Sequence, residues 1–148
     1  MMANTYKESI LIVDFGSQVT QLIARRVREH GVYCEIFPYS QIDIALDKLN
    51  PSGIILSGGP ASVTTKDAPS IDKKIFNLKI PILGICYGQQ IMCSLLGGEV
   101  ETAKNKEFGR ANIKFLKSSP LFEGFDAKDN KEPCLLYTSD AADDVASV

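Results

Sequence analysis

One cysteine stands between two glycines where two differently patterned segments meet, and it is the residue best placed to do chemistry. The motif reads Gly84-Ile85-Cys86-Tyr87-Gly88. An apolar run precedes it and helical spacing follows it, so the cysteine occupies a strand-to-helix turn, as in a nucleophile elbow. The two glycines would relieve crowding in a sharp turn that holds Cys86 in a strained, outward-pointing conformation. The motif predicts a nucleophilic thiol; the alternative is a buried structural cysteine between chance glycines.

The helix expected after this cysteine would raise its reactivity. A helix N-terminus carries partial positive charge, which favours an anionic sulfur. The backbone N–H of Tyr87 would then be placed to hold an oxyanion formed by attack on a carbonyl carbon. Gln89 and Gln90 fall in the first turn of this helix. From the residues alone, both are best interpreted as exposed helix glutamines, although either could bind an amide or a carboxylate.

A second glycine-rich segment, Ser57-Gly58-Gly59-Pro60, follows another apolar run. Without Cβ atoms, the two glycines let backbone N–H groups face a ligand. If both apolar runs are neighbouring parallel strands, this loop lies on the same sheet edge as Cys86. Gly59 would then supply a second oxyanion donor; the alternative is a plain turn, because Gly-Gly-Pro often serves as one.

The remaining candidates are less favourable. His30 is the single histidine, and it falls at the end of the first predicted helix, at the sheet edge opposite Cys86. We therefore expect it to be a helix C-terminal cation and not the base of the thiol. Asp14 either contributes to the site or caps a turn, and the sequence leaves both open. Cys34 and Cys93 are expected to be small core residues.

Apolar runs alternate with helical periodicities along most of the chain, which predicts the elements that position these residues. Strands are expected at 9–14, 32–37, 53–57 and 81–85, and helices from 19 to Gly31, at 42–49, at 69–78 and at 87–96. A weak edge strand at 111–115 and a short helix starting at Ser119-Pro120 would follow. The predicted fold class is α/β: a doubly wound, mainly parallel sheet with helices on both faces, incomplete at the C-terminus.

The composition excludes several classes of protein. The chain has 148 residues, of which 45% are hydrophobic and 23% charged, and a net charge of −2. This is typical of one soluble domain. No basic excess indicates nucleic-acid binding, and no apolar run approaches the roughly 20 residues that span a bilayer, so we expect no membrane partner and a cytoplasmic location. With one histidine in the chain, a zinc site is not expected, and no cofactor or metal is predicted for the chain itself.

Two segments resemble a known family, the class I glutamine amidotransferases. The segment 83–90 is similar to the family's nucleophile signature, and 54–60 is similar to its oxyanion loop. The first strand and helix, 10–29, resemble more selectively the glutamine-hydrolysing GMP synthases, as do 50–53 and 107–109. The resemblance runs from about Ser9 to Phe125.

The resemblance implies a role for each motif residue. Cys86 would attack the side-chain amide of glutamine, with the oxyanion held by Gly59 and Tyr87. Gln90 and Gly58 would contact the bound glutamine, and Gly84 and Gly88 would shape the elbow. In members of this group, ammonia passes to an ATP-pyrophosphatase domain that uses ATP and Mg²⁺ to convert xanthosine monophosphate to GMP, commonly in a homodimer. The alternatives are an amidotransferase subunit of anthranilate or carbamoyl-phosphate synthesis, or a non-catalytic flavodoxin-like module.

The chain departs from this family pattern after the cysteine. The family's triad histidine and glutamate form a His-x-Glu motif well beyond the nucleophile, and no histidine follows Cys86. The ATP-using domain is also absent, so we expect the 148-residue chain to be inactive. Residues 134–148 resemble the translation of a sequencing adapter, with a natural tail as the alternative. The expected division is therefore 1–133 as a partial amidotransferase domain and 134–148 as a non-native tail.

Overall fold

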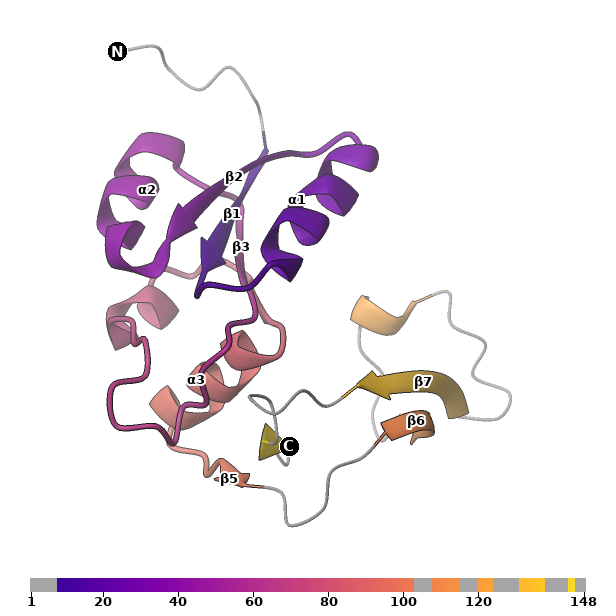
Figure 1. Ribbon diagram of the computed structural model, residues 1–148. Helices are drawn as coiled ribbons and strands as arrows, with labels where there is room; N and C mark the ends of the chain where they lie inside the picture. The colour runs from indigo at the N-terminus through magenta and orange to yellow at the C-terminus, as the bar shows by residue number, and fades with distance from the viewer. Residues whose placement is uncertain (1–7, 103–107, 115–119, 124–130, 138–143, 146–148) are drawn as a thin grey trace.

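The computed structural model of the chain describes residues 8–102, 108–114, 120–123, 131–137 and 144–145. Its centre is a four-stranded parallel sheet in the order β2-β1-β3-β4 (Figure 1). The strands are β1 Ser9–Asp14, β2 Tyr33–Pro38, β3 Gly53–Leu56 and β4 Ile82–Gly84. The α-helices are α1 Val19–Glu29, α2 Ile42–Leu49 and α3 Tyr87–Leu95. The predicted α/β class, with a parallel sheet between helices, is confirmed.

The register of the sheet brings the ends of three strands to one level. Val13 of β1 pairs with Leu56 of β3, and Leu56 pairs with Gly84 of β4. The loops that follow these strands therefore start side by side at the carboxyl edge. The strand order reverses between β1 and β3, and such a switch point is where doubly wound sheets place their ligands.

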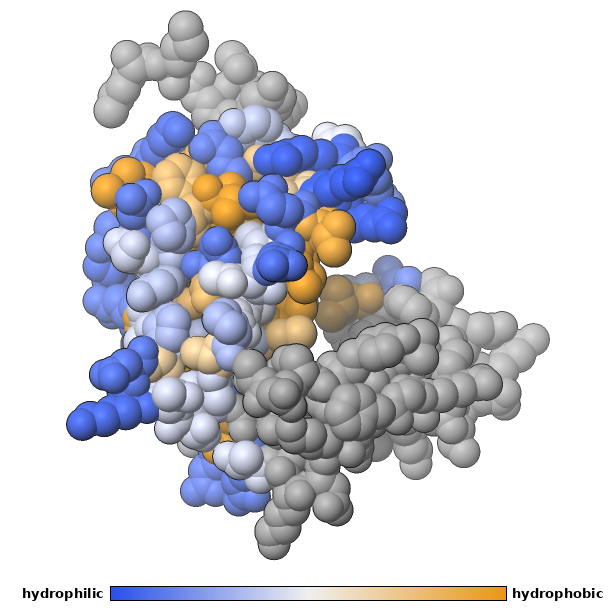
Figure 2. All heavy atoms as spheres, in the orientation of Figure 1, coloured by the Kyte–Doolittle hydropathy of each residue, from blue (hydrophilic) through white to orange (hydrophobic). Residues whose placement is uncertain are grey.

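Each face of the sheet has its own hydrophobic core. Alternate residues such as Leu11, Val13 and Leu56 pack with α2 and α3, whereas Ile12 packs with Ala24 of α1. In Figure 1, α1 and α2 cover opposite faces of the sheet. Leu83 pairs with Ile55, which belongs to the core under α1. It is 37% exposed, so α1 leaves part of this face uncovered. Figure 2 shows hydrophobic surface at the N-terminal end of α1, where Leu22 is 58% exposed.

The helix predicted at 69–78 is wrong in type and length. The structure forms only a 3₁₀ helix, η2 Lys73–Asn77. Its start is set by Asp72, whose side chain accepts a hydrogen bond from the N–H of Lys74. Ile71 and Ile75 are buried as their spacing predicted, but Leu78 is 41% exposed. The apolar spacing therefore indicated which residues are buried, and an irregular segment buries two of the three without a full helix. A second 3₁₀ turn, η1 Tyr39–Gln41, precedes α2.

The described segments after α3 form two small antiparallel pairs. Strand β6 Phe108–Lys114 pairs with β7 Lys131–Tyr137, and β5 Glu101–Thr102 pairs with β8 Asp144–Val145. The strand expected at 111–115 thus starts earlier, and residue 115 lies outside the described residues. A 3₁₀ turn, η3 Pro120–Phe122, follows the expected Ser119, which also lies outside them. Strand β7 crosses the expected boundary at residue 133. Within the described residues, no helix is long and apolar enough to cross a membrane.

Candidate active site

Cys86 forms the turn between β4 and α3. Its backbone has φ 52° and ψ −117°, in the positive-φ region that residues with a side chain rarely occupy. The residue is exposed, as the sequence predicted for an elbow. Its carbonyl accepts hydrogen bonds from the N–H groups of Gln89 and Gln90, at 3.0 and 3.2 Å, which closes the first turn of α3. The strain is thus held by regular hydrogen bonds on the helix side, and the thiol is left at the helix N-terminus.

The two glycines of the motif are required by close backbone packing. A Cβ added at Gly84 would lie 2.8 Å from Cα of Gln89, and one added at Gly88 would overlap the carbonyl oxygen of Leu56. Such overlap with backbone atoms cannot be relieved by a side-chain rotation. Only glycine therefore lets α3 pack directly on the end of β3.

Two backbone hydrogen bonds tie the elbow to the neighbouring strand. Ile85 donates to the carbonyl of Leu56 at 2.9 Å, and Gly88 donates to the carbonyl of Ser57 at 3.0 Å. The segment that carries Cys86 and the loop that starts at Ser57 are therefore fixed to each other through main-chain atoms.

The glycine loop after β3 lies against the cysteine. A Cβ added at Gly58 would meet Cβ of Cys86 at 3.4 Å and Oγ of Ser17 at 3.5 Å. Gly59 instead backs onto the β1–α1 loop, where an added Cβ would lie 2.7 Å from the carbonyl oxygen of Phe15. Gly58 and Cys86 thus share one space, and Gly59 fits only because it has no side chain.

Tyr87 is the first residue of α3, and its ring is buried. The ring packs on Phe15 with centroids 5.0 Å apart, and Phe15 stacks on Tyr39 with centroids 5.8 Å apart. The Tyr87 hydroxyl donates a hydrogen bond to the carbonyl of Pro69. Burial raises the pKa of Tyr87, and Tyr39 adds to this shift. As in any first helical turn, the N–H of Tyr87 has no acceptor within its own helix.

Gln90 is buried, contrary to the exposed position that the residues alone suggested. Only 6% of it is exposed, and its Oε1 accepts a hydrogen bond from the N–H of Val63 at 3.3 Å. The side chain therefore connects α3 to the loop that follows Gly59.

A chain of polar side chains lies beneath the glycine loop, and it was not predicted from the sequence. Asp14 accepts hydrogen bonds at Oδ1 from the N–H of Gly16 and the hydroxyl of Thr20, both at 2.9 Å. Thr20 in turn contacts the hydroxyl of Ser57 at 2.9 Å. The open question about Asp14 is answered in part, since it caps the turn after β1. No local signal identifies this polar chain, because Thr20 and Ser57 lie 37 positions apart and meet only in the folded sheet.

The other sequence candidates lie away from this edge. His30 is exposed at the end of α1, at the amino edge of the sheet. Cys34 is buried in β2, and burial raises the pKa of its thiol, partly opposed by Arg28. Cys93 is only half-buried, so the expectation of a core residue is wrong for it. In the part of the chain that the structure describes, no group of His, Cys, Asp and Glu could hold a metal.

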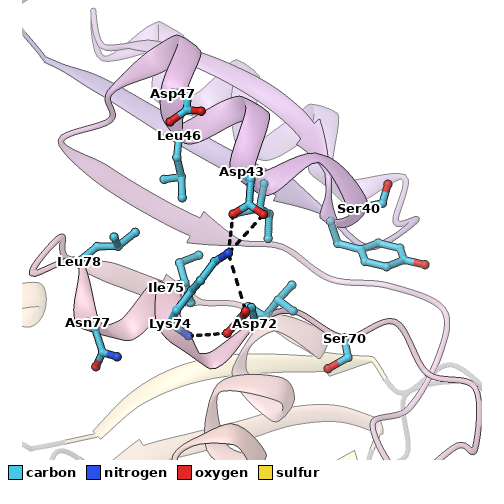
Figure 3. Close-up of a pocket in the computed structure, with 13 residues that line it drawn as sticks. Ser40, Asp43, Leu46, Asp47, Ser70, Asp72, Lys74, Ile75, Asn77 and Leu78 are labelled. Atoms are coloured by element: carbon cyan, nitrogen blue, oxygen red, sulfur yellow. Dashed lines mark hydrogen bonds and ion pairs between the residues drawn. The ribbon is translucent and has the colours of Figure 1, made fainter.

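A cavity of about 540 Å³ lies between α2 and the segment around η2 (Figure 3). In Figure 3, Lys74 points between Asp43 and Asp72, with a 3.0 Å contact to Asp43. Tyr39 lines the cavity and also belongs to the aromatic stack that reaches Tyr87. Cys86 is not among the lining residues, so this cavity is beside the candidate site and does not contain it.

An exposed thiol on a strand-to-helix turn, at the carboxyl edge of a parallel sheet, defines a class of protein with an elbow nucleophile. The family profile named Glutamine amidotransferase class-I matches residues 11–147, and the chain belongs to this family.

The chain is similar in sequence to curated GMP synthases of the glutamine-hydrolysing type. The protein from Phenylobacterium zucineum (strain HLK1) is 54% identical over 133 residues, 90% of this chain and 26% of that protein. The one from Agrobacterium fabrum (strain C58) is 61% identical over 120 residues, 81% of this chain and 23% of that protein. The chain thus spans about a quarter of the length of these relatives.

A similar solved structure is that of a protein from Thermoplasma acidophilum, described as a GMP synthase subunit. It has a TM-score of 0.70 and 30% sequence identity, over 95% of this chain and 67% of that one. The fold and the family are therefore shown independently of the site geometry.

Proposed function

We propose that the chain carries the nucleophile of a glutaminase, with Cys86 as the attacking residue. The thiolate forms a bond to the side-chain amide carbon of glutamine, and the carbonyl electron pair moves to oxygen. Collapse of this intermediate expels the nitrogen, which takes up a proton and leaves as ammonia. Water then attacks the γ-glutamyl thioester, giving glutamate and the free thiol. The observation that carries the proposal is the exposed Cys86 at φ 52°, at the N-terminus of α3 and beside Gly58.

The neighbouring backbone supports the proposed binding roles. We assign the oxyanion to the N–H groups of Tyr87 and Gly59, and contact with the bound glutamine to Gly58 and Gln90. The lack of an intrahelical acceptor at Tyr87 leaves its N–H for the developing charge. Gln90 connects the substrate region to Val63, so its loss would affect both binding and the loop. Gly84 and Gly88 keep the elbow close to β3.

In the whole protein, the ammonia would serve the amination of xanthosine monophosphate to GMP. The support is the 53–61% identity to glutamine-hydrolysing GMP synthases. This step would use ATP and Mg²⁺ in a C-terminal ATP-pyrophosphatase domain, and the assembled enzyme would be a cytoplasmic homodimer. The relatives named above are GMP synthases, which supports the purine pathway over anthranilate or carbamoyl-phosphate synthesis.

The 148-residue chain is expected to carry out little turnover by itself. Its one histidine, His30, ends α1 at the amino edge, away from the thiol. Without a base near Cys86, the rate of glutamine hydrolysis falls by several orders of magnitude. Covalent capture by an activated analogue needs no such base for leaving-group protonation, so it tests the nucleophile alone.

The test is covalent capture of a chloromethyl ketone analogue of glutamine. Intact mass and peptide mapping should show one adduct, on Cys86, and excess glutamine should slow its formation whereas asparagine should not. Adducts spread evenly over Cys34, Cys86 and Cys93, or no protection by glutamine, would contradict the proposal. A non-catalytic binding module would give no adduct selective for Cys86, and a ligand other than glutamine would slow the labelling.

Residues 134–148 are proposed to be foreign to the domain, on the character of their sequence alone. The family match extends to residue 147 and strand β7 spans 131–137, so neither separates the two parts. Sequencing an independent clone across codon 133 tests the proposal. The same codons in that clone would make the tail native.

A further inference from the structure

A buried hydrogen-bonded chain joins the end of β1 to the loop beside Cys86. Thr20 is 1% exposed and Ser57 is fully buried. Their hydroxyl oxygens lie 2.9 Å apart, and the Thr20 hydroxyl lies 2.9 Å from Oδ1 of Asp14. Buried hydroxyl groups need partners, and here three elements supply them: β1, α1 and the loop after β3.

The hydrogen bonds of this buried network can be donated in only one direction. A carboxylate only accepts hydrogen bonds, so the proton of Thr20 is directed at Asp14. Thr20 can then only accept from Ser57, which must donate its own proton. The other contact of the Ser57 hydroxyl, to the carbonyl of Gly58 at 3.4 Å, is longer and has no second proton to use. The donors therefore run from Ser57 to Thr20 to Asp14.

Ser57, the first donor of this hydrogen-bonded network, is also held through its main chain. Ser57 donates its N–H to Val13 at 3.0 Å and accepts at its carbonyl from Gly88 at 3.0 Å. The side-chain bond to Thr20 adds a third, fixed connection. The next residue, Gly58, is the one that faces Cys86. Loss of the Ser57–Thr20 bond would therefore remove one of three restraints on the backbone that leads into Gly58 and Gly59.

We propose that Thr20 is a positioning residue, which holds the Ser57–Gly59 segment where its N–H groups meet the oxyanion formed on attack by Cys86. The inference rests on the proposed glutaminase function, and it adds a residue of α1 that touches neither substrate nor sulfur. Thr20 acts through Ser57. A merely structural role would change stability without separating reactions that need the oxyanion site from those that do not.

The test compares two reagents on Cys86. Both reagents alkylate the sulfur at a saturated carbon with loss of halide. The glutamine part of the chloromethyl ketone would place its carbonyl against the oxyanion donors, whereas iodoacetamide has no such part and does not depend on them. The quantity measured is the ratio of the two second-order rate constants, in the full chain, after far-UV circular dichroism has shown the fold. The variants are Thr20→Val, Thr20→Ser and Ser57→Ala. Ser9→Ala is the matched control, because Ser9 is a buried hydroxyl at the opposite sheet edge, bonded to Leu49.

Thr20→Val and Ser57→Ala should each lower the ratio about tenfold, the usual scale for losing one buried hydrogen bond. Thr20→Ser should restore it to within about twofold, and Ser9→Ala should leave it unchanged. The proposal is overturned if Thr20→Val keeps the wild-type ratio, if Thr20→Ser is as impaired as Thr20→Val, or if Ser9→Ala lowers the ratio equally.

Hydrogen exchange separates this proposal from the proposed function. If wild-type Cys86 shows no preference for the ketone over iodoacetamide, the glutaminase proposal fails. The positioning proposal is then decided by the amides of Gly58 and Gly59. Faster exchange in Thr20→Val, restored in Thr20→Ser, supports it, and unchanged exchange in Thr20→Val overturns it.

Discussion

The amino and carboxyl edges of the parallel sheet both contain residues with positive φ, but these residues have different roles. At the amino edge, Gly31 and Asn50 have positive φ values of 74° and 45°, and each terminates a helix. At the carboxyl edge, the strained residue is Cys86, and features from β1, β3 and β4 converge on it. A glycine or a residue with positive φ therefore does not by itself indicate a functional site, since it can simply end a helix. Convergence from several strands on one thiol distinguishes a site from a helix end.

Removing the sulfur should give the largest difference between the edges. Cys86→Ser should lower covalent capture of the glutamine analogue by about a thousandfold or more, because a hydroxyl without a base is a poor nucleophile. His30→Ala, at the amino edge, should leave capture unchanged. Intact-mass kinetics measure both. A matching loss in His30→Ala would place the histidine in the site and contradict the topology.

Alanine at a glycine should separate the edges next. Gly88→Ala should destabilise the fold by about 3 kcal/mol, because its Cβ would overlap the Leu56 carbonyl. Gly31→Ala should destabilise it by only about 1 kcal/mol, the penalty for a left-handed residue with a side chain. No described atom lies within 4 Å of a Cβ there. Urea denaturation gives both values, and equal losses would show that packing at the elbow is looser than described.

Thiol labelling should rank the three cysteines whose exposure the structure describes, out of four in the sequence. Cys86 is exposed, Cys93 is half-buried and Cys34 is buried, so iodoacetamide should modify Cys86 at least about tenfold faster than Cys34. Peptide mapping after short exposures gives the order. Equal rates for all three would indicate that the elbow geometry is lost in solution.

A weaker contrast should appear at alkaline pH. Burial raises the pKa of Cys34 above its ordinary value of 9.0, so the folded state holds this proton more tightly than the unfolded state. The resulting stability is fully present below pH 9.0 and is lost as the pH rises through the raised pKa. Cys34→Ala should flatten the fall in unfolding free energy above that pH. An unchanged slope in Cys34→Ala would assign the fall to other groups.

The sequence predicted the parallel sheet well because its strands are short, continuous apolar runs ended by turn residues. It also predicted that Cys86 lies in the turn between β4 and α3, because Gly84 and Gly88 flank this residue. It failed at 69–78, where the spacing of Ile71, Ile75 and Leu78 matches a helix but Asp72 starts a shorter turn. Periodicity reports which residues face the core, not which backbone conformation brings them there.

The polar chain escaped prediction for a different reason. Thr20 looks like any polar residue of an amphipathic helix, and its partners Asp14 and Ser57 lie 6 and 37 positions away. Only the register of β1 against β3 brings them together. Gln90 shows the same limit: its side chain accepts a hydrogen bond from the N–H of Val63, a loop residue with no regular pattern. Contacts between loops follow from the folded sheet and cannot be deduced from local spacing.

The packing of Gly88 on β3 has a consequence for how such a site can change. The sulfur is located by main-chain bonds from Ile85 and Gly88 to Leu56 and Ser57, and none of these depends on a side chain. Residues around the thiol can therefore be exchanged without moving it. If Cys86 is the nucleophile as proposed, a library that keeps the glycines and varies the surrounding loops would alter which amide is accepted, while the position of the sulfur stays the same.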